Sequence, residues 1–326
     1  MEFLRLSNPS AGKAADVPRA TVGIATSFLA RTKTRNISHT IGIGLIEHLG
    51  DIVACEPVAR RLKAKNPKAH LYWVVKAPYR EIISSNPYID EAIVVDCLTD
   101  WIKMVYHRVF DEVVDLHVNG RICQDCGVPL SKLQGDISIT GDNYFNHGSL
   151  LKSFCIGAGI EPLDEQPRVY IPDEARRNVD HLDLPKEFVV LHCFSNEVSK
   201  DWSPRKWEEL AALIREKTAL KIIEVGLVPI LHELEGQINV CGRLSVLETA
   251  EVIKRGALFV GVDSGPAHLA NAVQTPIVGS NSHLPSKNRK EGSASWTATY
   301  NLSAYEVTFC LETNRDNNKT LQCHIP

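Results

Sequence analysis

Short apolar runs alternate along this chain with stretches whose apolar residues repeat at helical spacing. In the first half, four apolar runs predict short buried strands at residues 41–46, 71–75, 91–95 and 112–116. Helical spacing appears at residues 52–62, 101–109 and 149–159, where glycines end the last pattern. Strands that alternate with helices in this way predict a parallel sheet with crossover helices.

The second half repeats the alternation. Strands are predicted at residues 188–192, 221–225, 239–240, 257–262 and 277–278, and helices at 207–217 and 247–255. Between the halves, residues 161–172 carry three prolines among charged residues, as a linker does. A chain of 326 residues also exceeds the usual size of one hydrophobic core. We therefore predict an α/β protein with a flexible lead-in at 1–20 and two Rossmann-like domains, at 21–165 and 173–326, with residues 21–25 as a further possible strand.

Residues 261–270, with the sequence GVDSGPAHLA, predict a strand end, a sharp turn and the start of a helix. The backbone N–H groups of Ser264 and Gly265 would lie at the positive end of the helix dipole, where a phosphate binds well. His268 could add a donor within the first turn. The alternative is that Asp263 or Ser264 simply caps the helix and Gly265 permits the turn.

Asp51 occupies a similar position in the first half. It follows the apolar run at 41–46 and precedes the helical pattern, so it is placed at the carboxyl end of a strand. Gly50 beside it allows close approach of a ligand. A carboxylate in this place is a candidate general base, although a Gly-Asp pair at such a junction is also a common helix cap.

These segments occur in an order that resembles glycosyltransferase family 9, the ADP-heptose:lipopolysaccharide heptosyltransferases. The first half carries Leu49-Gly50-Asp51-Ile52-Val53, Pro57, Asn66-Pro67 and Asn86-Pro87-x-Ile89-Asp90. The second half carries Lys200-x-Trp202-x-Pro204-x-x-Trp207-x-Glu209-Leu210, Gly242-x-x-Ser245 and Asp263-Ser264-Gly265-Pro266-Ala267-His268-Leu269-Ala270. The resemblance covers residues 41 to 285, in both halves and in order.

The resemblance implies a GT-B fold, in which two Rossmann-like domains face each other across a cleft. It implies a metal-independent, inverting transfer of a sugar, a heptose in this family, from a nucleotide diphosphate such as ADP-heptose. The N-terminal domain would bind an acidic glycoconjugate acceptor such as lipopolysaccharide core, and the C-terminal domain would bind the donor. We expect a cytoplasmic enzyme with at most peripheral contact with the inner membrane. Alternatives are a sugar-nucleotide epimerase and a non-catalytic sugar-nucleotide-binding protein.

Sugar transfer needs a base for the acceptor hydroxyl and positive potential for the departing diphosphate. Asp51 is the predicted base. Lys200 and Ser195, in a loop after the strand at 188–192, would bind the diphosphate together with Asp263, Ser264, Gly265 and His268. The chain contains no Asp-x-Asp pair to hold a divalent cation, so we expect no metal and no cofactor.

The chain departs from the family pattern at one position. An acidic residue that contacts the donor ribose commonly follows the glycine ending a strand of the second domain. Here Gly226 is followed by Leu227, Val228 and Pro229, and Glu224 and Glu233 do not match that position. The identity of the donor therefore stays open.

Charge is unevenly distributed. The net charge is −3, yet residues 31–80 hold ten Lys or Arg against three acids. Arg60, Arg61 and Lys63 lie near the end of the helix that Asp51 starts, and they could guide an acidic acceptor. The alternative is a solvated helix end whose cations complement the helix dipole. Nucleic acid is excluded as a partner because no aromatics interleave with the basic residues.

Nine cysteines and no export signal predict reduced thiols. Residues 1–20 lack a continuous apolar segment, and no run of about eighteen apolar residues predicts a membrane span. Cys123 and Cys126 have the spacing of metal ligands, which Cys310, Cys323 and His324 could complete. This spacing matches no standard zinc finger, so we favour buried or loop thiols. Trp202 and Trp207 are predicted to be packing residues.

Overall fold

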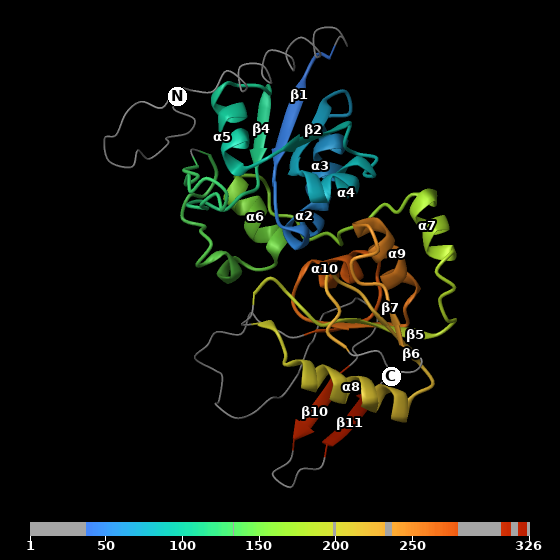
Figure 1. Cartoon of the computed structure of the whole chain (residues 1–326). Helices are drawn as coiled ribbons and strands as arrows, with labels where there is room; N and C mark the ends of the chain where they lie inside the picture. The colour runs from blue at the N-terminus through green and yellow to red at the C-terminus, as the bar shows by residue number, and fades with distance from the viewer. Residues whose placement is uncertain are drawn as a thin grey trace. The chain divides into compact units, whose positions relative to one another are not determined.

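The computed structural model describes residues 37–132, 134–197, 200–231 and 237–279, and the backbone of strands β10 (Thr308–Thr313) and β11 (Lys319–His324). The predicted lead-in at 1–20, the possible strand at 21–25, and the side chains of Cys310, Cys323 and His324 lie outside these residues. The chain divides into two units, Met1–Tyr170 and Ile171–Pro326 (Figure 1). The division falls inside the segment with the linker composition.

Unit 1 contains a four-stranded, fully parallel sheet with the strand order β3-β2-β1-β4. The strands are β1 (Thr40–Gly44), β2 (His70–Lys76), β3 (Glu91–Val95) and β4 (Glu112–Asp115). The chain builds outward from β1 to β3 and then returns to place β4 on the other side of β1. The predicted alternation of strands and helices is therefore confirmed in this unit.

The connections of unit 1 are mostly helical. They are α2 (Leu49–Ala54), α3 (Glu56–Lys65), η1 (Ala77–Tyr79), α4 (Arg80–Ser84) and α5 (Leu98–Tyr106), followed by η2 (Tyr144–His147) and α6 (Leu150–Ala158). Right-handed crossovers put the helices of the outward path on one face and α5, on the return path, on the other. Figure 1 shows α5 and α3 on opposite sides of the sheet.

One continuous helix was predicted over residues 52–62, and the structure has two. Helix α2 ends at Ala54, and α3 begins two residues later with Pro57 in its first turn. Proline has no backbone N–H, so it cannot continue the hydrogen-bond ladder of α2 but is well suited to start α3. Cys55 serves both as the C-cap of α2 and as the N-cap of α3.

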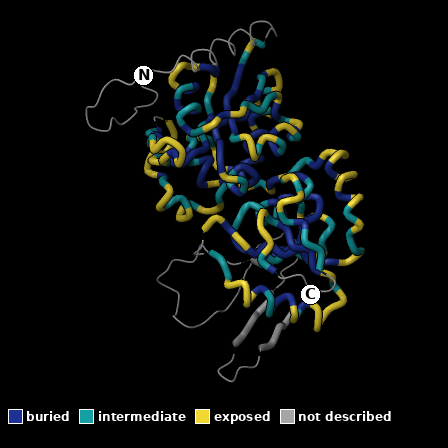
Figure 2. The backbone as a smooth tube through the Cα atoms, in the orientation of Figure 1, coloured by how far each residue is buried: buried dark blue, intermediate teal, exposed yellow. Residues whose placement is uncertain are grey.

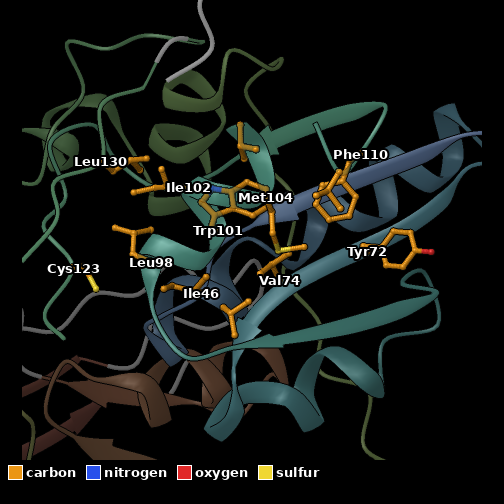
Figure 3. Close-up of a cluster of buried hydrophobic side chains, with 13 residues drawn as sticks. Ile46, Tyr72, Val74, Leu98, Trp101, Ile102, Met104, Phe110, Cys123 and Leu130 are labelled. Carbon is orange, nitrogen blue, oxygen red and sulfur yellow. The ribbon is translucent and has the colours of Figure 1, made fainter. Parts of the chain in front are cut away.

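Aromatic side chains pack directly on the backbone of β1. The ring of Trp101 lies against Gly44 and the ring of Phe110 against Gly42, so neither glycine has room for a Cβ. The rest of this cluster comes from α5, the neighbouring strands and the segment after β4, and it includes Tyr72, Met104 and Leu130 (Figure 3). The glycines of β1 thus allow large rings to approach the sheet closely.

Unit 2 contains a five-stranded parallel sheet with the strand order β7-β6-β5-β8-β9. The strands are β5 (Phe188–His192), β6 (Lys221–Glu224), β7 (Gln237–Asn239), β8 (Leu258–Gly261) and β9 (Ile277–Gly279). The helices are α7 (Asp173–Asp180), α8 (Pro204–Lys217), α9 (Val246–Arg255) and α10 (Gly265–Ala272). Strands β10 and β11 form a separate antiparallel pair that the sequence pattern did not predict.

The central strands of both units are buried, as the dark blue segments in Figure 2 show. In unit 2, Trp207 of α8 is fully buried against β5 and β6, and Trp202 packs at the margin of the same cluster. Their rings meet edge to face with centroids 5.2 Å apart. The prediction that both tryptophans are packing residues is confirmed. No helix in the described part of the chain is long and apolar enough to cross a membrane.

The close contact between Gly44 of β1 and the ring of Trp101 predicts that even a methyl group at Gly44 lowers the stability of the fold. Gly44→Ala should reduce the free energy of unfolding by about 1–3 kcal/mol, because the added methyl group overlaps the ring and overpacks the core. Gly141→Ala is the matched control, since its Cβ would meet no atom within 4 Å. Urea denaturation of both variants checks the prediction, and equal stability of the two would contradict it.

Candidate functional site

Both sheets reverse their strand order next to their first strand. In unit 1 the reversal lies between β1 and β4, and in unit 2 between β5 and β8. Loops that follow two such strands leave the same edge of the sheet in opposite directions, which opens a crevice where ligands of α/β proteins bind. A ligand site is therefore expected at this edge of each unit.

In unit 2 the reversal brings two distant segments into contact. His192, the last residue of β5, pairs in register with Gly261, the last residue of β8. Beyond these residues, Lys200 Nζ lies 3.4 Å from Asp263 Oδ2 and 3.2 Å from Glu197 Oε2. The loop after β5 and the turn before α10 thus share an ion pair, although the two residues are far apart in the sequence.

Lys200 keeps its charge in this position. Partial burial lowers the pKa of its amine, but the carboxylates of Asp263 and Glu197 raise the pKa by more, so the net shift is upward. Asp263 is itself buried. A cation fixed by a buried carboxylate at a sheet edge is oriented before any ligand arrives.

The turn before α10 has the predicted form. Ser264 is the N-cap residue, Gly265 the first helical residue and Pro266 the second. The Ser264 side chain makes no capping hydrogen bond to the helix, and its Oγ instead lies 3.3 Å from the carbonyl oxygen of Val262. Ser264 thus occupies the N-cap position of the alternative, but its side chain satisfies no N–H group of the helix. His268 is the fourth residue of α10.

Ser195 organises the loop that carries Lys200. Its backbone N–H donates to Asp201 Oδ1 at 2.8 Å, its Oγ lies 2.7 Å from the same oxygen, and it accepts from the N–H of Glu197 at 3.1 Å. The serine is buried. Its hydroxyl is thus used within the loop, and its predicted contact with phosphate stays a prediction. The supporting residues Asp201 and Glu197 were missed in the sequence.

Glu224, at the end of β6, is the acid nearest to the position where the chain departs from the family pattern. Its carboxylate is buried and accepts the backbone N–H groups of Ile230 at 2.7 Å and Leu231 at 3.3 Å. Burial raises its pKa despite these hydrogen bonds. This acid therefore shapes its own loop, while Leu227 and Val228 are 82% and 56% exposed at the tip.

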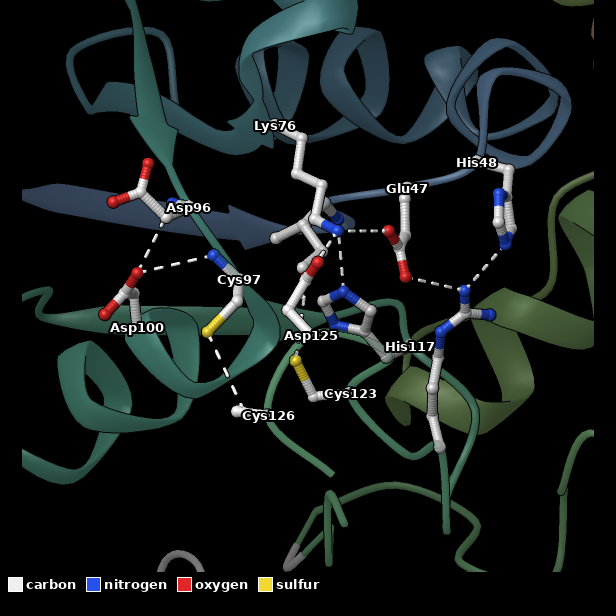
Figure 4. Close-up of polar contacts among 12 residues, drawn as sticks. Glu47, His48, Lys76, Asp96, Cys97, Asp100, His117, Cys123, Asp125 and Cys126 are labelled. Atoms are coloured by element: carbon white, nitrogen blue, oxygen red, sulfur yellow. Dashed lines mark hydrogen bonds and ion pairs between the residues drawn. The ribbon is translucent and has the colours of Figure 1, made fainter. Parts of the chain in front are cut away.

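In unit 1 a buried carboxylate stands at the corresponding edge (Figure 4). Glu47, just after β1, pairs with Lys76 Nζ at 2.8 Å and with Arg121 Nη2 at 3.0 Å. Lys76 is the last residue of β2 and Arg121 follows β4, so three neighbouring strands supply the cluster. Arg121 also reaches His48 Nε2 at 2.9 Å, and Lys76 reaches Asp125 Oδ2 at 2.8 Å.

The two cations keep Glu47 ionised. Burial alone would raise the pKa of its carboxyl group, but hydrogen bonds from Lys76 and Arg121 and the charge of both residues lower the pKa below its ordinary value. None of these three residues was predicted as a site residue. Glu47 directly follows the predicted strand, so its position was the only signal in the sequence.

Asp51, the predicted base, is the third residue of α2 and follows Glu47 by four residues in the sequence. The N-cap of α2 is His48, without a side-chain cap, so Asp51 is not the capping residue that the alternative required. Tyr79 lies near both acids: burial, Glu47 and Asp51 together raise the pKa of its hydroxyl. Asp51 is half-buried at the carboxyl edge of the sheet, as predicted.

A buried pair of His117 and Asp115 lies next to this edge. His117 Nδ1 is 2.7 Å from Asp115 Oδ1, and its Nε2 accepts the backbone N–H of Ile46 at 3.1 Å. The ring is 1% exposed. Because Nε2 accepts a hydrogen bond, the ring proton is assigned to Nδ1. Through the N–H of Ile46, this pair holds the loop between β1 and α2. The sequence did not predict it.

The predicted acceptor cations are mostly paired. Arg60 binds Glu56, Glu165 and the carbonyl oxygen of Gln166, and Lys63 lies 2.6 Å from Asp90. The side chain of Arg61 is 46% exposed, and its ion pair with a carboxylate oxygen of Glu161 is long, at 3.8 Å. Arg60 and Lys63 thus hold segments of unit 1 together, and the acceptor role of all three stays a prediction.

Comparison with known proteins bears on the family resemblance. Residues 160–280 match the model of "Glycosyltransferase family 9 (heptosyltransferase)". Lipopolysaccharide heptosyltransferase 3 of Escherichia coli is 22% identical over 273 residues, which are 70% of this chain and 79% of that protein. The chain is similar to the family 9 heptosyltransferases, and these matches support a glycosyltransferase. The predicted family resemblance is confirmed.

Solved structures support the fold of this glycosyltransferase. The family 9 glycosyltransferase of Veillonella parvula DSM 2008 is 19% identical with a TM-score of 0.53, over 74% of this chain and 80% of that one. ADP-heptose lps heptosyltransferase II of E. coli is 16% identical with a TM-score of 0.54, over 74% of this chain and 84% of that one. The predicted GT-B fold class is confirmed.

The charge of Glu47 predicts how stability depends on pH. Because its folded pKa is lowered, its contribution is fully present above the ordinary value of 4.5 and is lost as the pH falls through the folded value. Glu47→Gln should therefore cost about 1.5–3 kcal/mol at neutral pH, and the gap to the parent protein should close in acid. Unfolding measured from pH 7 to pH 3 tests this.

Glu161→Gln is the control for this series. Glu161 is 65% exposed, and its nearest cations are 3.7 and 3.8 Å away. Its effect should stay within about 0.5 kcal/mol at every pH. If the difference in free energy of unfolding between Glu47→Gln and the parent did not change with pH, the charge of Glu47 would not stabilise the fold.

Proposed function

We propose that this glycosyltransferase transfers a heptose from ADP-heptose to an acidic glycoconjugate of the lipopolysaccharide type, with inversion and without a metal ion at the diphosphate. One observation carries the proposal: Lys200 meets Asp263 beside the start of α10, at the strand reversal of unit 2. The donor and the acceptor are those in the names of the relatives, heptosyltransferase 3 and ADP-heptose heptosyltransferase II. The site of action would be the cytoplasmic face of the inner membrane.

The diphosphate would bind where Lys200 and the first turn of α10 converge. The backbone N–H groups of Gly265 and of the residues after Pro266 lie at the positive end of the helix dipole. Lys200 adds a full charge, and His268, the fourth residue of α10, would add a donor. These fixed positive groups would stabilise the charge that develops on the leaving diphosphate, which is the part that a divalent cation plays elsewhere.

Asp51 would take the proton of the acceptor hydroxyl while that oxygen attacks the anomeric carbon. Attack from the side opposite the diphosphate inverts the configuration at that carbon. The ionised cluster of Glu47, Lys76 and Arg121 would hold the loop that precedes α2 and thereby position Asp51. Of the predicted acceptor cations, Arg61 is the one whose exposure suits the attraction of an acidic acceptor.

Asp51→Asn tests the base. Asparagine keeps the shape of the side chain but cannot accept the proton, so transfer should fall at least about a hundredfold while donor binding is retained. The measurement is the initial rate of ADP release with acceptor present, beside calorimetry of ADP binding. Asp142→Asn, at an exposed aspartate, is the control and should be unaffected. Transfer above about a tenth of the parent rate would remove Asp51 from the mechanism.

Two substitutions test the diphosphate site. Lys200→Ala should weaken ADP binding by about 1.5–3 kcal/mol and leave adenosine binding unchanged, because a charge-assisted contact to phosphate is lost. Gly265→Val should also act on ADP alone, by crowding the backbone that approaches the phosphates. High salt should shrink the lysine effect and not the glycine effect.

The control for this pair is Lys186→Ala, an exposed lysine at the opposite end of β5. Calorimetry is run in EDTA with ADP, UDP, GDP and CDP. ADP binding that appears only after Mg²⁺ is added would contradict the metal-free site, and tighter binding of another nucleotide would contradict the donor. Equal losses for ADP and adenosine would show that neither residue contacts phosphate.

A further inference from the structure

Three cysteine sulfurs that the proposed transfer does not use gather in unit 1. Cys97 directly precedes α5, while Cys123 and Cys126 lie in the turn after β4. One ligand atom from each lies within 4.8 Å of the others. The sequence showed the spacing of Cys123 and Cys126, but Cys97 is brought to them only by the path through α5 and β4 (Figure 4).

The distances suit a shared ligand better than a covalent bond. Zinc binds thiolate sulfur at about 2.3 Å in tetrahedral geometry, which puts two sulfurs about 3.8 Å apart. The sulfurs of Cys97 and Cys126 are 3.9 Å apart. A disulfide needs about 2.05 Å between the sulfurs, and all three cysteines are free thiols.

The turn that holds Cys123 and Cys126 is shaped to present sulfur. Gly127 follows with a positive φ of 70°, and its N–H donates to the carbonyl oxygen of Cys123 at 2.8 Å. This tight turn brings Cys126 back beside Cys123, so both sulfurs reach Cys97.

Packing alone does not explain this cluster. Cys123 is 2% exposed and belongs to the hydrophobic core, as a buried thiol should. Cys126, in contrast, is exposed, yet it lies beside Cys97 and 2.7 Å from the hydroxyl of Thr99. An exposed thiol held against two others has the arrangement of a ligand.

We propose that Cys97, Cys123 and Cys126 bind a zinc ion, with water in the fourth position. Each thiol loses its proton to solvent as its Zn–S bond forms. Water is assigned because, within the described residues, no other histidine, cysteine or carboxylate joins this group of ligand atoms. Soft thiolates select zinc over magnesium or calcium.

The zinc would hold the turn after β4 against the start of α5. That turn also carries Asp125, which binds Lys76, and it follows Arg121, which binds Glu47. The ion would therefore support the charged cluster at the edge of unit 1 without touching a substrate. Its role is distinct from the proposed metal-free diphosphate site in unit 2, so each can fail without the other.

Elemental analysis of the full-length protein, purified under reducing conditions and reconstituted with zinc, tests the proposal. About one zinc per chain is expected, and cobalt in its place should give thiolate-to-metal absorption bands. Cys126→Ser should lose most of the metal and, because the residue is exposed, still fold. Cys97→Ser should do the same. Cys241→Ser, at a half-buried cysteine of unit 2, is the matched control and should retain the zinc.

Thermal unfolding adds a readout that is independent of composition. A strong chelator should lower the Tm of the parent protein and of Cys241→Ser, and it should not change the Tm of Cys126→Ser. Equal zinc in Cys126→Ser and the parent would overturn the proposal, as would a chain that binds no zinc. Loss of zinc on Cys323→Ser alone would place the ion at the tail and overturn it too.

Discussion

The parallel pairing of one central strand with neighbours on both sides determines where chemistry can occur in this protein. β1 pairs with β2 and β4, and β5 pairs with β6 and β8. Because all these strands run in the same direction, every loop that follows them emerges at one edge. Lys200 reaches Asp263, and Glu47 reaches Arg121, as a direct result of this pairing.

Charges at these two edges are balanced before any ligand binds. In unit 2 a buried acid orients a lysine, and in unit 1 two cations keep a buried glutamate ionised. A group held in this way pays little reorganisation energy during a reaction, which is the basis of electrostatic preorganisation. The same balance has a structural effect, since each ion pair ties together loops from different strands.

The sequence predicted the features that depend on local pattern. Strand positions, the helix start at Gly265 and the location of Asp51 follow from apolar runs and turn residues. What it could not predict depends on partners far away in the chain. Arg60 appears to be a free surface cation until residues 165 and 166 are placed beside it, and Cys97 meets Cys126 only after the chain has crossed the sheet. The sequence also did not reveal the hydrogen bonds of Ser195 to Asp201.

The segment that leaves unit 1 has a consequence for how the protein is divided into fragments. Glu56 is buried and accepts hydrogen bonds from Arg60, from the backbone N–H of Arg168 at 3.0 Å and from the hydroxyl of Tyr170 at 2.9 Å. The match to the family begins at residue 160, yet the chain stays bound to unit 1 as far as Tyr170. A fragment cut where the family match begins would remove two partners of Glu56 and leave a buried carboxylate beside one arginine. The physical end of the first unit therefore lies inside the region that sequence families assign to the second.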